Sequence, residues 1–354
     1  MHRPTLLFKR AVSLQASRKL ASSSELPALK VALAKCASMM DVQYKEDAVL
    51  HAALAKLGVD VRQPQWDDPL HDWAQVRVAI RDTCVATCGA LLTVPRSYLD
   101  GQYALVVPRL TWDYQTKPKI FSSWMATVQD CSRLCNPPRT LAWSAHKSYL
   151  RDLDAAGIPV IPTIWILPGG EDRIGSQAAS LGRQQALIKP AVGATSSGCM
   201  VFTVGEEDER ARAHAAEQLN EQDSLLLQPF CADVMAEGEY SLMLWDGRLS
   251  HGVRKVPVAG EYRVQDDFGG TDEPWDPPAE VVEIALRAAN MAPGGWTYAR
   301  VDFLHDDSFG WCVLECEMVE PRLFFRRAPT EEVRRLAQSL HGLATRNRSP
   351  NTTP

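Results

Sequence analysis

Residues 311–321, WCVLECEMVEP, constrain the fold of this chain more than any other stretch. They alternate in the manner of a buried β-strand, yet they carry three glutamates among sulfur-containing and aliphatic side chains. Burying a carboxylate without a partner costs several kcal/mol, so a strand with only a structural role is not expected to carry this pattern. Because successive side chains point to opposite faces, Glu315 and Glu317 share one face, while Glu320 falls on the packing face where the strand ends.

A second strand, expected in WTYARVDFL at 296–304, can supply a third acid. Arg300 and Asp302 share one face of this second strand. On the first strand, Glu315 and Glu317 occupy positions i and i+2, so their carboxylates lie roughly 7 Å apart. If the strands pair, Asp302 approaches Glu315 and Glu317. Three oxygen donors on one sheet face suit Mg²⁺ or Mn²⁺ shared with nucleotide phosphates. The alternative is an exposed face with solvated acids.

Residues 238–255 are expected to form a β-hairpin, because Asp246-Gly247 between alternating segments favours a type I′ turn. Alternation along its second strand separates Arg254 from Lys255. We expect Arg254 and Arg300 to face phosphates from adjacent strands and to stabilise the charge of phosphoryl transfer.

The segment LIKPAVGATSSG, residues 187–198, ends an apolar strand with Lys189 and continues into a loop of small residues. The backbone N–H groups of such a loop can surround phosphate oxygens. The loop residues expected at the phosphates are Thr195, Ser196, Ser197 and Gly198. Lys147 in SAHKSYL is a further candidate for a phosphate contact, with a solvated surface lysine as the alternative.

Bulk properties exclude two classes of partner. The chain has 354 residues and a net charge of −5, so no basic face indicates nucleic acid. No apolar run approaches the ~18 residues of a membrane span. The first 24 residues are basic and contain no acid, as in a mitochondrial or plastid transit peptide or a disordered basic tail. The expected location is therefore cytoplasmic, or mitochondrial or plastid if the leader is a transit peptide.

Nine cysteines without a secretory signal indicate reduced thiols. Three pairs share one spacing, namely Cys84/Cys88, Cys131/Cys135 and Cys312/Cys316. This spacing is compatible with zinc ligands, but Cys312 and Cys316 lie on the packing face of their strand, which favours small core residues.

The alternation of strands and helices divides the chain into five segments. These are a basic leader at 1–29, an N-terminal α/β lobe at 30–135, a central lobe at 136–225, a C-terminal lobe with the metal site at 226–341 and a disordered tail at 342–354. Residues 75–102 interrupt the N-terminal lobe as an insertion or an extra hairpin.

The order of these parts resembles the ATP-grasp superfamily. The resemblance implies a mixed α/β and α+β fold, with an N-terminal open α/β lobe and two α+β lobes that clamp ATP. Within the superfamily, the chain is similar to the cycloserine synthetase-like group, ATP-dependent cyclo-ligases that act on O-ureidoserine. The motifs that carry this are TWDY (111–114), HKSYL (146–150), IPVIPT (158–163), IKPAVGATSSG (188–198), QPF (228–230), residues 237–270, YARVDF (298–303) and LECEMVEP (314–321).

Roles follow from the resemblance position by position. ATP phosphates would contact Lys147 and Lys189, the adenine edge would meet Gln228, Pro229 and Phe230, and the ribose would meet Glu239. Magnesium would bind Asp302, Glu315 and Glu317, the last standing where many ATP-grasp enzymes have asparagine. Arg254 and Arg300 would be catalytic, and the groups on the substrate side would be Arg109, Asp113, Arg263 and Gln265.

The function implied is an ATP- and Mg²⁺-dependent carboxylate–amine ligase that proceeds through an acyl phosphate, with an intramolecular cyclo-ligase as one form. Its partner is a small amino-acid-like substrate, and the sequence indicates no oligomeric state. Two departures from the family pattern, Leu110 after Pro108 and the segment 75–102, lie in the substrate-side lobe. They keep two alternatives open: a nucleotide-binding regulatory protein without turnover, and a ligase that joins two separate substrates as glutathione synthetase does.

Overall fold

The computed structural model describes residues 29–40, 45–73 and 103–346. Several expectations lie outside these residues: residues 1–28 of the leader, the interrupting segment at 75–102 with Cys84 and Cys88, and residues 347–354 of the tail. Within the described part, no helix combines the length and the apolar content that crossing a bilayer requires.

The N-terminal lobe contains a four-stranded parallel sheet in the order β2-β1-β3-β4, here called the N-terminal sheet. Its elements are β1 (Lys30–Lys35), α2 (Lys45–Ala55), β2 (Asp60–Arg62), β3 (Leu105–Leu110), α3 (Pro118–Cys131) and β4 (Arg133–Leu134), with short 3₁₀ turns at Ala37–Met39 and Tyr114–Thr116. All six residues of β3 are buried, as expected for a parallel strand covered on both faces.

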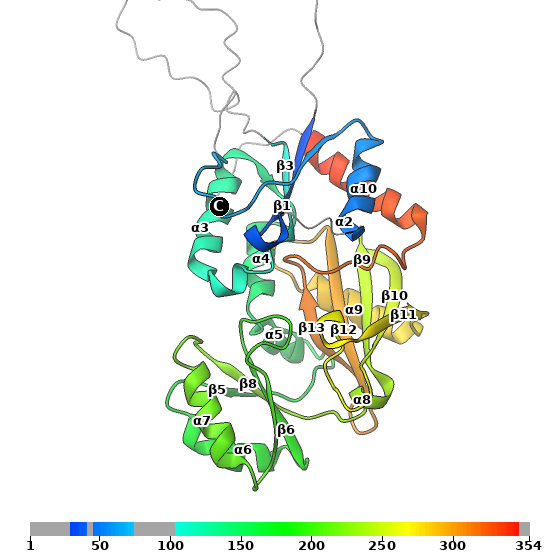
Figure 1. Cartoon of the computed structure of the whole chain (residues 1–354). Coiled ribbons are helices and arrows are strands. Elements are labelled where there is room, and N and C mark those ends of the chain that lie inside the picture. The colour runs from blue at the N-terminus through cyan, green and yellow to red at the C-terminus, as the bar shows by residue number, and fades with distance from the viewer. Residues whose placement is uncertain (1–28, 41–44, 74–102, 347–354) are drawn as a thin grey trace, which may run out of the picture.

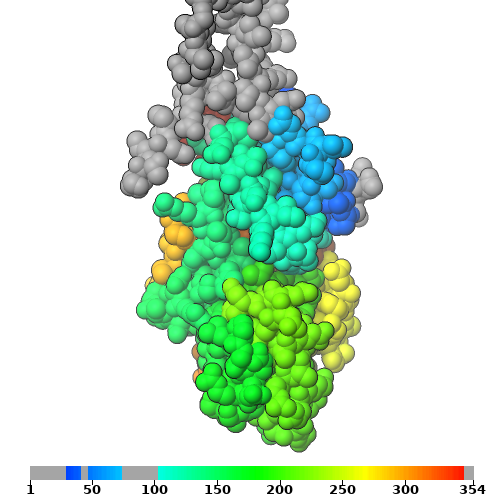
Figure 2. All heavy atoms as spheres, turned by 90° about the vertical axis from the view of Figure 1, so that its left-hand side faces the viewer, coloured from blue at the N-terminus to red at the C-terminus, as the bar shows by residue number. Residues whose placement is uncertain are grey.

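The central lobe contains a four-stranded antiparallel sheet in the order β5-β8-β6-β7, here called the central sheet. Its strands are β5 (Ile164–Ile166), β6 (Gln185–Pro190), β7 (Met200–Thr203) and β8 (Leu225–Pro229). The helices are α4 (Pro138–Ala145), α5 (Tyr149–Ala155), α6 (Ile174–Ser180) and α7 (Asp208–Gln218), with a 3₁₀ turn at Glu171–Arg173. Residues of α6 and α7 share an apolar core with the sheet, and the lobe forms the lower end of the molecule (Figures 1 and 2).

The expected boundary between residues 225 and 226 is wrong. It falls at the start of β8, but β8 hydrogen-bonds between β5 and β6 within the central sheet. An apolar strand indicates burial, but it does not indicate which sheet will bury it.

The C-terminal lobe contains a five-stranded sheet in the order β11-β10-β9-β12-β13, here called the C-terminal sheet. Its elements are α8 (Val234–Glu237), β9 (Glu239–Trp245), β10 (Arg248–Val256), a 3₁₀ turn at Asp266–Phe268, β11 (Thr271–Trp275), α9 (Ala279–Asn290), β12 (Tyr298–Asp306) and β13 (Gly310–Glu317). The hairpin prediction is confirmed, because β9 and β10 pair antiparallel and Asp246 and Gly247 both have positive φ, 54° and 73°. The helix α9 was not among the sequence predictions, and it packs against the face of the sheet that carries Leu242 and Val301.

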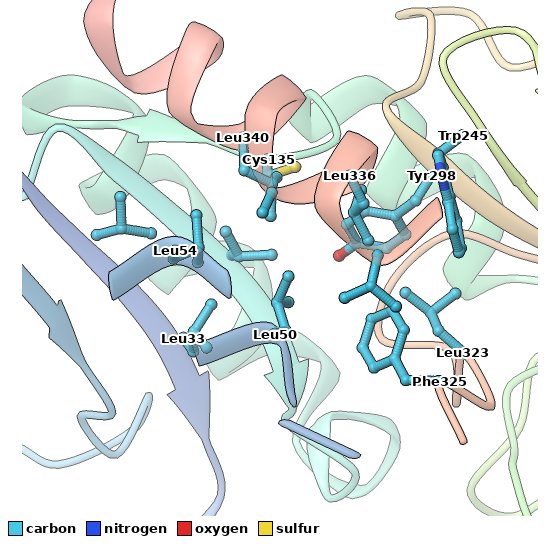
Figure 3. Packing of buried hydrophobic residues seen from close by; sticks show 14 of the residues in the cluster. Leu33, Leu50, Leu54, Cys135, Trp245, Tyr298, Leu323, Phe325, Leu336 and Leu340 are labelled. Atoms are coloured by element: carbon cyan, nitrogen blue, oxygen red, sulfur yellow. The ribbon is translucent and has the colours of Figure 1, made fainter. Parts of the chain in front are cut away.

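The last helix, α10 (Thr330–Thr345), returns to the N-terminal lobe. Its Leu336 and Leu340 share one core with Leu50 and Leu54 of α2 and with Tyr298 of β12 (Figure 3). Residues 342–345, expected in a disordered tail, are therefore helical. This core therefore joins the N-terminal lobe to the C-terminal lobe.

Candidate active site

A cavity of about 550 Å³ collects most of the residues predicted to be functional. It is lined from the central and C-terminal sheets and from segments of the N-terminal lobe. The predicted residues that line it are Lys147, Lys189, Thr195, Ser196, Ser197, Gln228, Pro229, Phe230, Glu239, Arg263, Gln265, Arg300, Asp302, Glu315 and Glu317. Four predicted residues do not line it: Gly198, Arg254, Arg109 and Asp113.

The acidic side chains lie together on one face of the C-terminal sheet, as predicted. Antiparallel pairing sets Asp302 opposite Glu315 and Arg300 opposite Glu317. Asp302 is buried and accepts a hydrogen bond of 2.5 Å from Ser241 on β9. The alternation along each strand therefore places these acids correctly, and the register between the strands brings them together.

Each acid is paired with a cation. The Nη2 of Arg300 lies 2.5 Å from Oε2 of Glu317, and its Nε lies 3.0 Å from Oδ1 of Asp302. The Nζ of Lys147 lies 3.5 Å from Oε1 of Glu315. Burial opposes the ionisation of Asp302, but Arg300 and Lys255 outweigh it and lower the pKa of Asp302 to about 2. At Glu317, burial prevails over Arg300 and raises the pKa.

Lysine 255 was not predicted, and it takes the place expected for Arg254. Its Nζ contacts Glu239 and lies 3.5 Å from Oδ1 of Asp302. Arg254 projects from the other face, where its Nε donates to the carbonyl of Glu237 at 2.5 Å and its Nη1 lies 3.2 Å from Glu273. The catalytic role predicted for Arg254 is therefore wrong by position.

A β-bulge explains the exchange. Regular pairing counted from the Asp246-Gly247 turn would set Arg254 opposite Glu239. The register instead shifts between Leu249 and His251, so that Lys255 lies opposite Glu239. One extra residue reverses which side chains face the acids. The signal in the sequence was the basic pair Arg254-Lys255, of which only Arg254 was predicted to be functional.

The acidic side chains of the cavity have the chemistry to hold a divalent cation. Among the described residues, no three acidic, histidine or cysteine side chains lie close enough together to coordinate a metal ion. Asp302, Glu315 and Glu317 instead form ion pairs with Arg300 and Lys147. The donor set nevertheless fits: Asp302, Glu315 and Glu317 are carboxylates on adjacent strands that open to one cavity, and oxygen donors are what Mg²⁺ prefers. Their metal-binding role stays a prediction.

Lysine 147 is held in place by the edge of the C-terminal sheet. The hydroxyl of Ser144 on α4 donates to the carbonyl of Cys316, and the hydroxyl of Tyr149 on α5 accepts from its N–H. These bonds satisfy the free edge of β13. Because Lys147 lies between α4 and α5, they bring it to Glu315, and its Nζ also donates to the carbonyl of Gly193 at 2.8 Å.

Lysine 189 and residues 195–197 of the small-residue loop line the cavity, and their phosphate contacts stay a prediction. Burial lowers the pKa of Lys189, and the charge of Glu315 opposes this effect. Thr195 and Ser196 both have positive φ, 53° and 56°, which is uncommon for residues other than glycine and typical of functional loops. Gly198 lies just outside the cavity, where a Cβ atom would be 2.4 Å from Oε1 of Gln218.

An apolar slot continues from the phosphate side. Phe230, at the end of β8, packs with Ile161 and Leu304, and its ring meets the ring of Tyr262 edge-on at 5.6 Å. Gln228 is buried and donates from Nε2 to Thr163 at 2.8 Å. A flat, uncharged heterocycle such as adenine fits this lining.

Two of the predicted substrate groups are elsewhere. Arg109 is buried in the N-terminal lobe, pairs with Asp47 at 3.2 Å and donates to the carbonyl of Pro321. Asp113 accepts from Trp66 at 2.7 Å and pairs with Lys117. Neither reaches the cavity, so a substrate contact is wrong for both. Arg109 packs where the N-terminal lobe meets Pro321, and Asp113 packs inside the N-terminal lobe.

Other residues take the substrate side of the cavity. Trp112 and Tyr114, the neighbours of Asp113, line it with Arg322, whose Nη1 lies 2.8 Å from Asp266. Arg263 lines it too, held by Glu261 at 2.5 Å and stacked on the ring of Phe268 at 3.7 Å. Gln265 shares this lining, so Arg263 and Gln265 remain predicted substrate groups.

The remaining glutamate of the opening strand, Glu320, also lines the cavity and is 3% exposed. Burial and the nearby charge of Glu317 raise the pKa of Glu320 well above its usual range.

The cysteines of the described residues fit the core interpretation. Cys131, Cys135, Cys312 and Cys316 are buried, and Cys316 packs in the core under α9. Among the residues of known placement, none of them joins a group of metal-binding side chains.

Comparisons with known proteins agree with this architecture. Residues 31–85 and 99–136 match the family model described as D-cycloserine synthetase DcsG, N-terminal domain. The family model therefore includes residues 75–85 and 99–102, which were expected to belong to an interruption. Only residues 86–98 of the segment expected at 75–102 are unmatched. The cycloserine biosynthesis protein DcsG of Streptomyces lavendulae is 25% identical over 304 residues, covering 83% of this chain and 92% of that protein.

Solved structures show the same fold. The crystal structure of D-cycloserine synthetase DcsG is 23% identical with a TM-score of 0.73, covering 89% of this chain and 99% of that one. The ATP-grasp ligase PsnB, solved with precursor peptide PsnA2 and AMPPNP, has a TM-score of 0.59 at 15% identity, covering 91% and 99%. D-alanine–D-alanine ligase from Bacillus anthracis has a TM-score of 0.59 at 14% identity, covering 90% and 97%.

Proposed function

We propose that the chain is an ATP-dependent carboxylate–amine ligase of the cycloserine synthetase-like group of ATP-grasp proteins, and that its substrate is a small amino-acid-like molecule. The match of its N-terminal lobe, its similarity to DcsG and its fold support this proposal. The substrate carboxylate attacks the γ-phosphorus of ATP, ADP leaves, and an acyl phosphate forms. A nitrogen nucleophile then attacks the acyl carbon, loses a proton and displaces phosphate. In a cyclo-ligase this nitrogen belongs to the same molecule, and O-ureidoserine is the first candidate.

The observation that carries the proposal is the gathering of opposite charges in one cavity. The charged side chains that line it include four carboxylates, Glu239, Asp302, Glu315 and Glu317, and four cations, Lys147, Lys189, Lys255 and Arg300. Such a site suits a highly charged ligand like a nucleotide triphosphate. Phosphoryl transfer requires mainly positioning and charge neutralisation, so no general base is needed for the first step.

The side chains divide this work between them. Lys147, Lys189 and the loop at 195–197 orient the phosphates, and the slot beside Phe230 takes the adenine with Glu239 at the ribose. Arg300 and Lys255 stabilise the charge that develops on the transferred group. Mg²⁺, or Mn²⁺ with the same oxygen donors, would be held by Asp302, Glu315 and Glu317 and would neutralise phosphate charge. Arg263 and Gln265 contact the substrate.

The decisive experiment is a screen for stimulated ADP release. Purified protein with Mg²⁺ and ATP is offered O-ureidoserine and other amino-acid derivatives, each with and without a separate amine. We expect ADP release only when a carboxylate and an amine are both present, and we expect hydroxylamine to trap the acyl phosphate as a hydroxamate.

Mass spectrometry of the product separates the two kinds of ligase, since a cyclo-ligase yields a ring from one molecule. Tight ATP binding without ADP release under any of these conditions would contradict the proposal and favour the regulatory protein. The comparisons do not favour that alternative, because the similar structures named above are ligases or synthetases.

A further inference from the structure

Glu320 is a buried carboxylate at the cavity wall. It is 3% exposed and lines the cavity. Across the part of the chain that the structure describes, its Oε2 has no hydrogen-bond partner. Buried polar groups are nearly always satisfied, and leaving a carboxylate unpaired is costly, so this one requires an explanation.

The backbone around Glu320 is fixed. Asn136 donates from Nδ2 to the carbonyl of Met318 at 2.8 Å, and Tyr298 donates from its hydroxyl to the carbonyl of Val319 at 3.2 Å. Arg109 donates to the carbonyl of Pro321 at 2.9 Å. The segment on both sides of Glu320 is thus hydrogen-bonded to two other elements, and its side chain is directed into the cavity by a rigid support.

The nearest cations are already occupied. Arg300 is paired with Asp302 and Glu317. Arg109 is paired with Asp47 and bonded to Pro321. Neither forms an ion pair with Glu320 that meets the distance of a direct contact. A cation bound in the cavity would therefore supply a charge that favours the ionised form of this carboxyl.

The cavity that Glu320 lines also contains aromatic side chains that suit an ammonium group. The rings of Tyr114, Phe324 and Trp112 line the same cavity, and the charge of Glu320 acts on the hydroxyl of Tyr114. Aromatic faces and a carboxylate together attract an organic cation more strongly than a hydrated inorganic ion.

We infer that Glu320 binds the protonated amino group of the substrate and makes that group a requirement for binding. The inference rests on the proposed ligase function only for the identity of the substrate. Glu320 would act by binding and positioning, and it would not take part in phosphoryl transfer.

The test compares Glu320→Gln with Glu283→Gln, a matched change at an exposed position of α9. The first readout is the melting temperature without ligand. The amide keeps the shape and removes the buried charge, so we expect Glu320→Gln to melt at or above the wild-type temperature. A melting temperature clearly below wild type would mean that Glu320 stabilises the fold, and it would overturn the inference.

The second readout is the response of the melting temperature to methylammonium chloride, measured against sodium chloride at equal ionic strength. It requires neither turnover nor knowledge of the substrate. We expect methylammonium to stabilise the wild type and Glu283→Gln but not Glu320→Gln. An equal response in all three proteins, or none in the wild type, would contradict an ammonium site at Glu320.

The third readout uses the amino acid that stimulates ADP release. Glu320→Gln should raise its KM roughly 10- to 100-fold, the range for a lost hydrogen bond to a charged group, while the Kd of ATP and the response to Mg²⁺ stay unchanged. Loss of the Mg²⁺ response would make Glu320 a metal ligand instead. If no compound releases ADP, the ligase proposal fails, and the first two readouts still decide the role of Glu320.

Discussion

Like-charged side chains as close as Glu239, Asp302, Glu315 and Glu317 cannot all ionise without counter-charges. The cavity supplies these counter-charges with Lys147, Lys189, Lys255 and Arg300. Removing one group therefore changes the protonation of its neighbours as well as its own contact. Paired substitutions of neighbouring residues on opposite faces separate these effects from loss of folding.

Arg254 and Lys255 are such a pair. Lys255→Met should lower ATP turnover by roughly 10²- to 10³-fold, the usual effect of removing one preorganised charge, because Lys255 contacts Glu239 and Asp302. Arg254→Met should retain near-normal turnover, because Arg254 points to the other face. Steady-state ADP release checks this. Equal losses in the two variants would contradict the assignment of faces.

The metal prediction is tested at Asp302 and Glu315. Asp302→Asn and Glu315→Gln should each abolish ATP turnover while folding survives, since both keep the side-chain volume. ADP release and circular dichroism are the measurements, with Glu283→Gln as the control. Near-normal turnover in both variants would show that these carboxylates hold no catalytic metal.

At the scale of elements, the helix α10 ties two lobes together. It belongs to the C-terminal end of the sequence but buries Leu336 and Leu340 against α2 of the N-terminal lobe. Its apolar stripe was visible in the sequence as an amphipathic helix. The surface that it covers was not, because amphipathicity indicates only that some apolar partner exists.

Leu340→Ala should therefore destabilise the protein by about 2–5 kcal/mol, the range for removing a buried leucine. Gln338→Ala, at an exposed position of the same helix, should change stability little. Urea unfolding followed by tryptophan fluorescence gives both free energies. A small effect at Leu340 would mean that α10 is not part of the shared core.

Strand alternation predicted the facing of some side chains correctly and of others wrongly. Alternation correctly grouped Asp302 with Arg300 and Glu315 with Glu317, because side-chain period is a local property of a strand. It failed at Arg254, because a β-bulge between Leu249 and His251 changes the register, and no residue type in that stretch of the sequence indicates the bulge. The family resemblance failed at Arg109 and Asp113, since membership of a motif does not indicate whether a side chain faces the cavity.

At the scale of the whole molecule, the cavity depends on the position of the central lobe over the C-terminal sheet. Besides the pair of Lys147 with Glu315, a second ion pair joins them directly: Nη2 of Arg183, before β6, lies 2.7 Å from Oδ1 of Asp306, at the end of β12. Asp306 is 1% exposed, so this pair is better shielded from solvent than a surface pair.

Arg183→Met should weaken ATP binding roughly three- to tenfold, because it removes a contact that holds the two walls of the cavity together. Arg212→Met is the control, since Arg212 pairs with Asp172 and Glu209 on the surface of the central lobe alone. Calorimetric titration with ATP and Mg²⁺ gives both dissociation constants. Unchanged affinity in Arg183→Met would mean that this pair does not support the cavity.

Local properties of the chain were enough to indicate the strands, the hairpin turn, the phosphate loop and the acidic face, because alternation, turn chemistry and motif order depend on near neighbours in sequence. Three matters depended on contacts between distant segments: the face on which Lys255 lies, the sheet that β8 joins and the surface that α10 covers. The same contacts account for Glu320. Its backbone is held by the N-terminal lobe and by β12, while its carboxylate is left for a ligand, which no pattern within residues 311–321 could reveal.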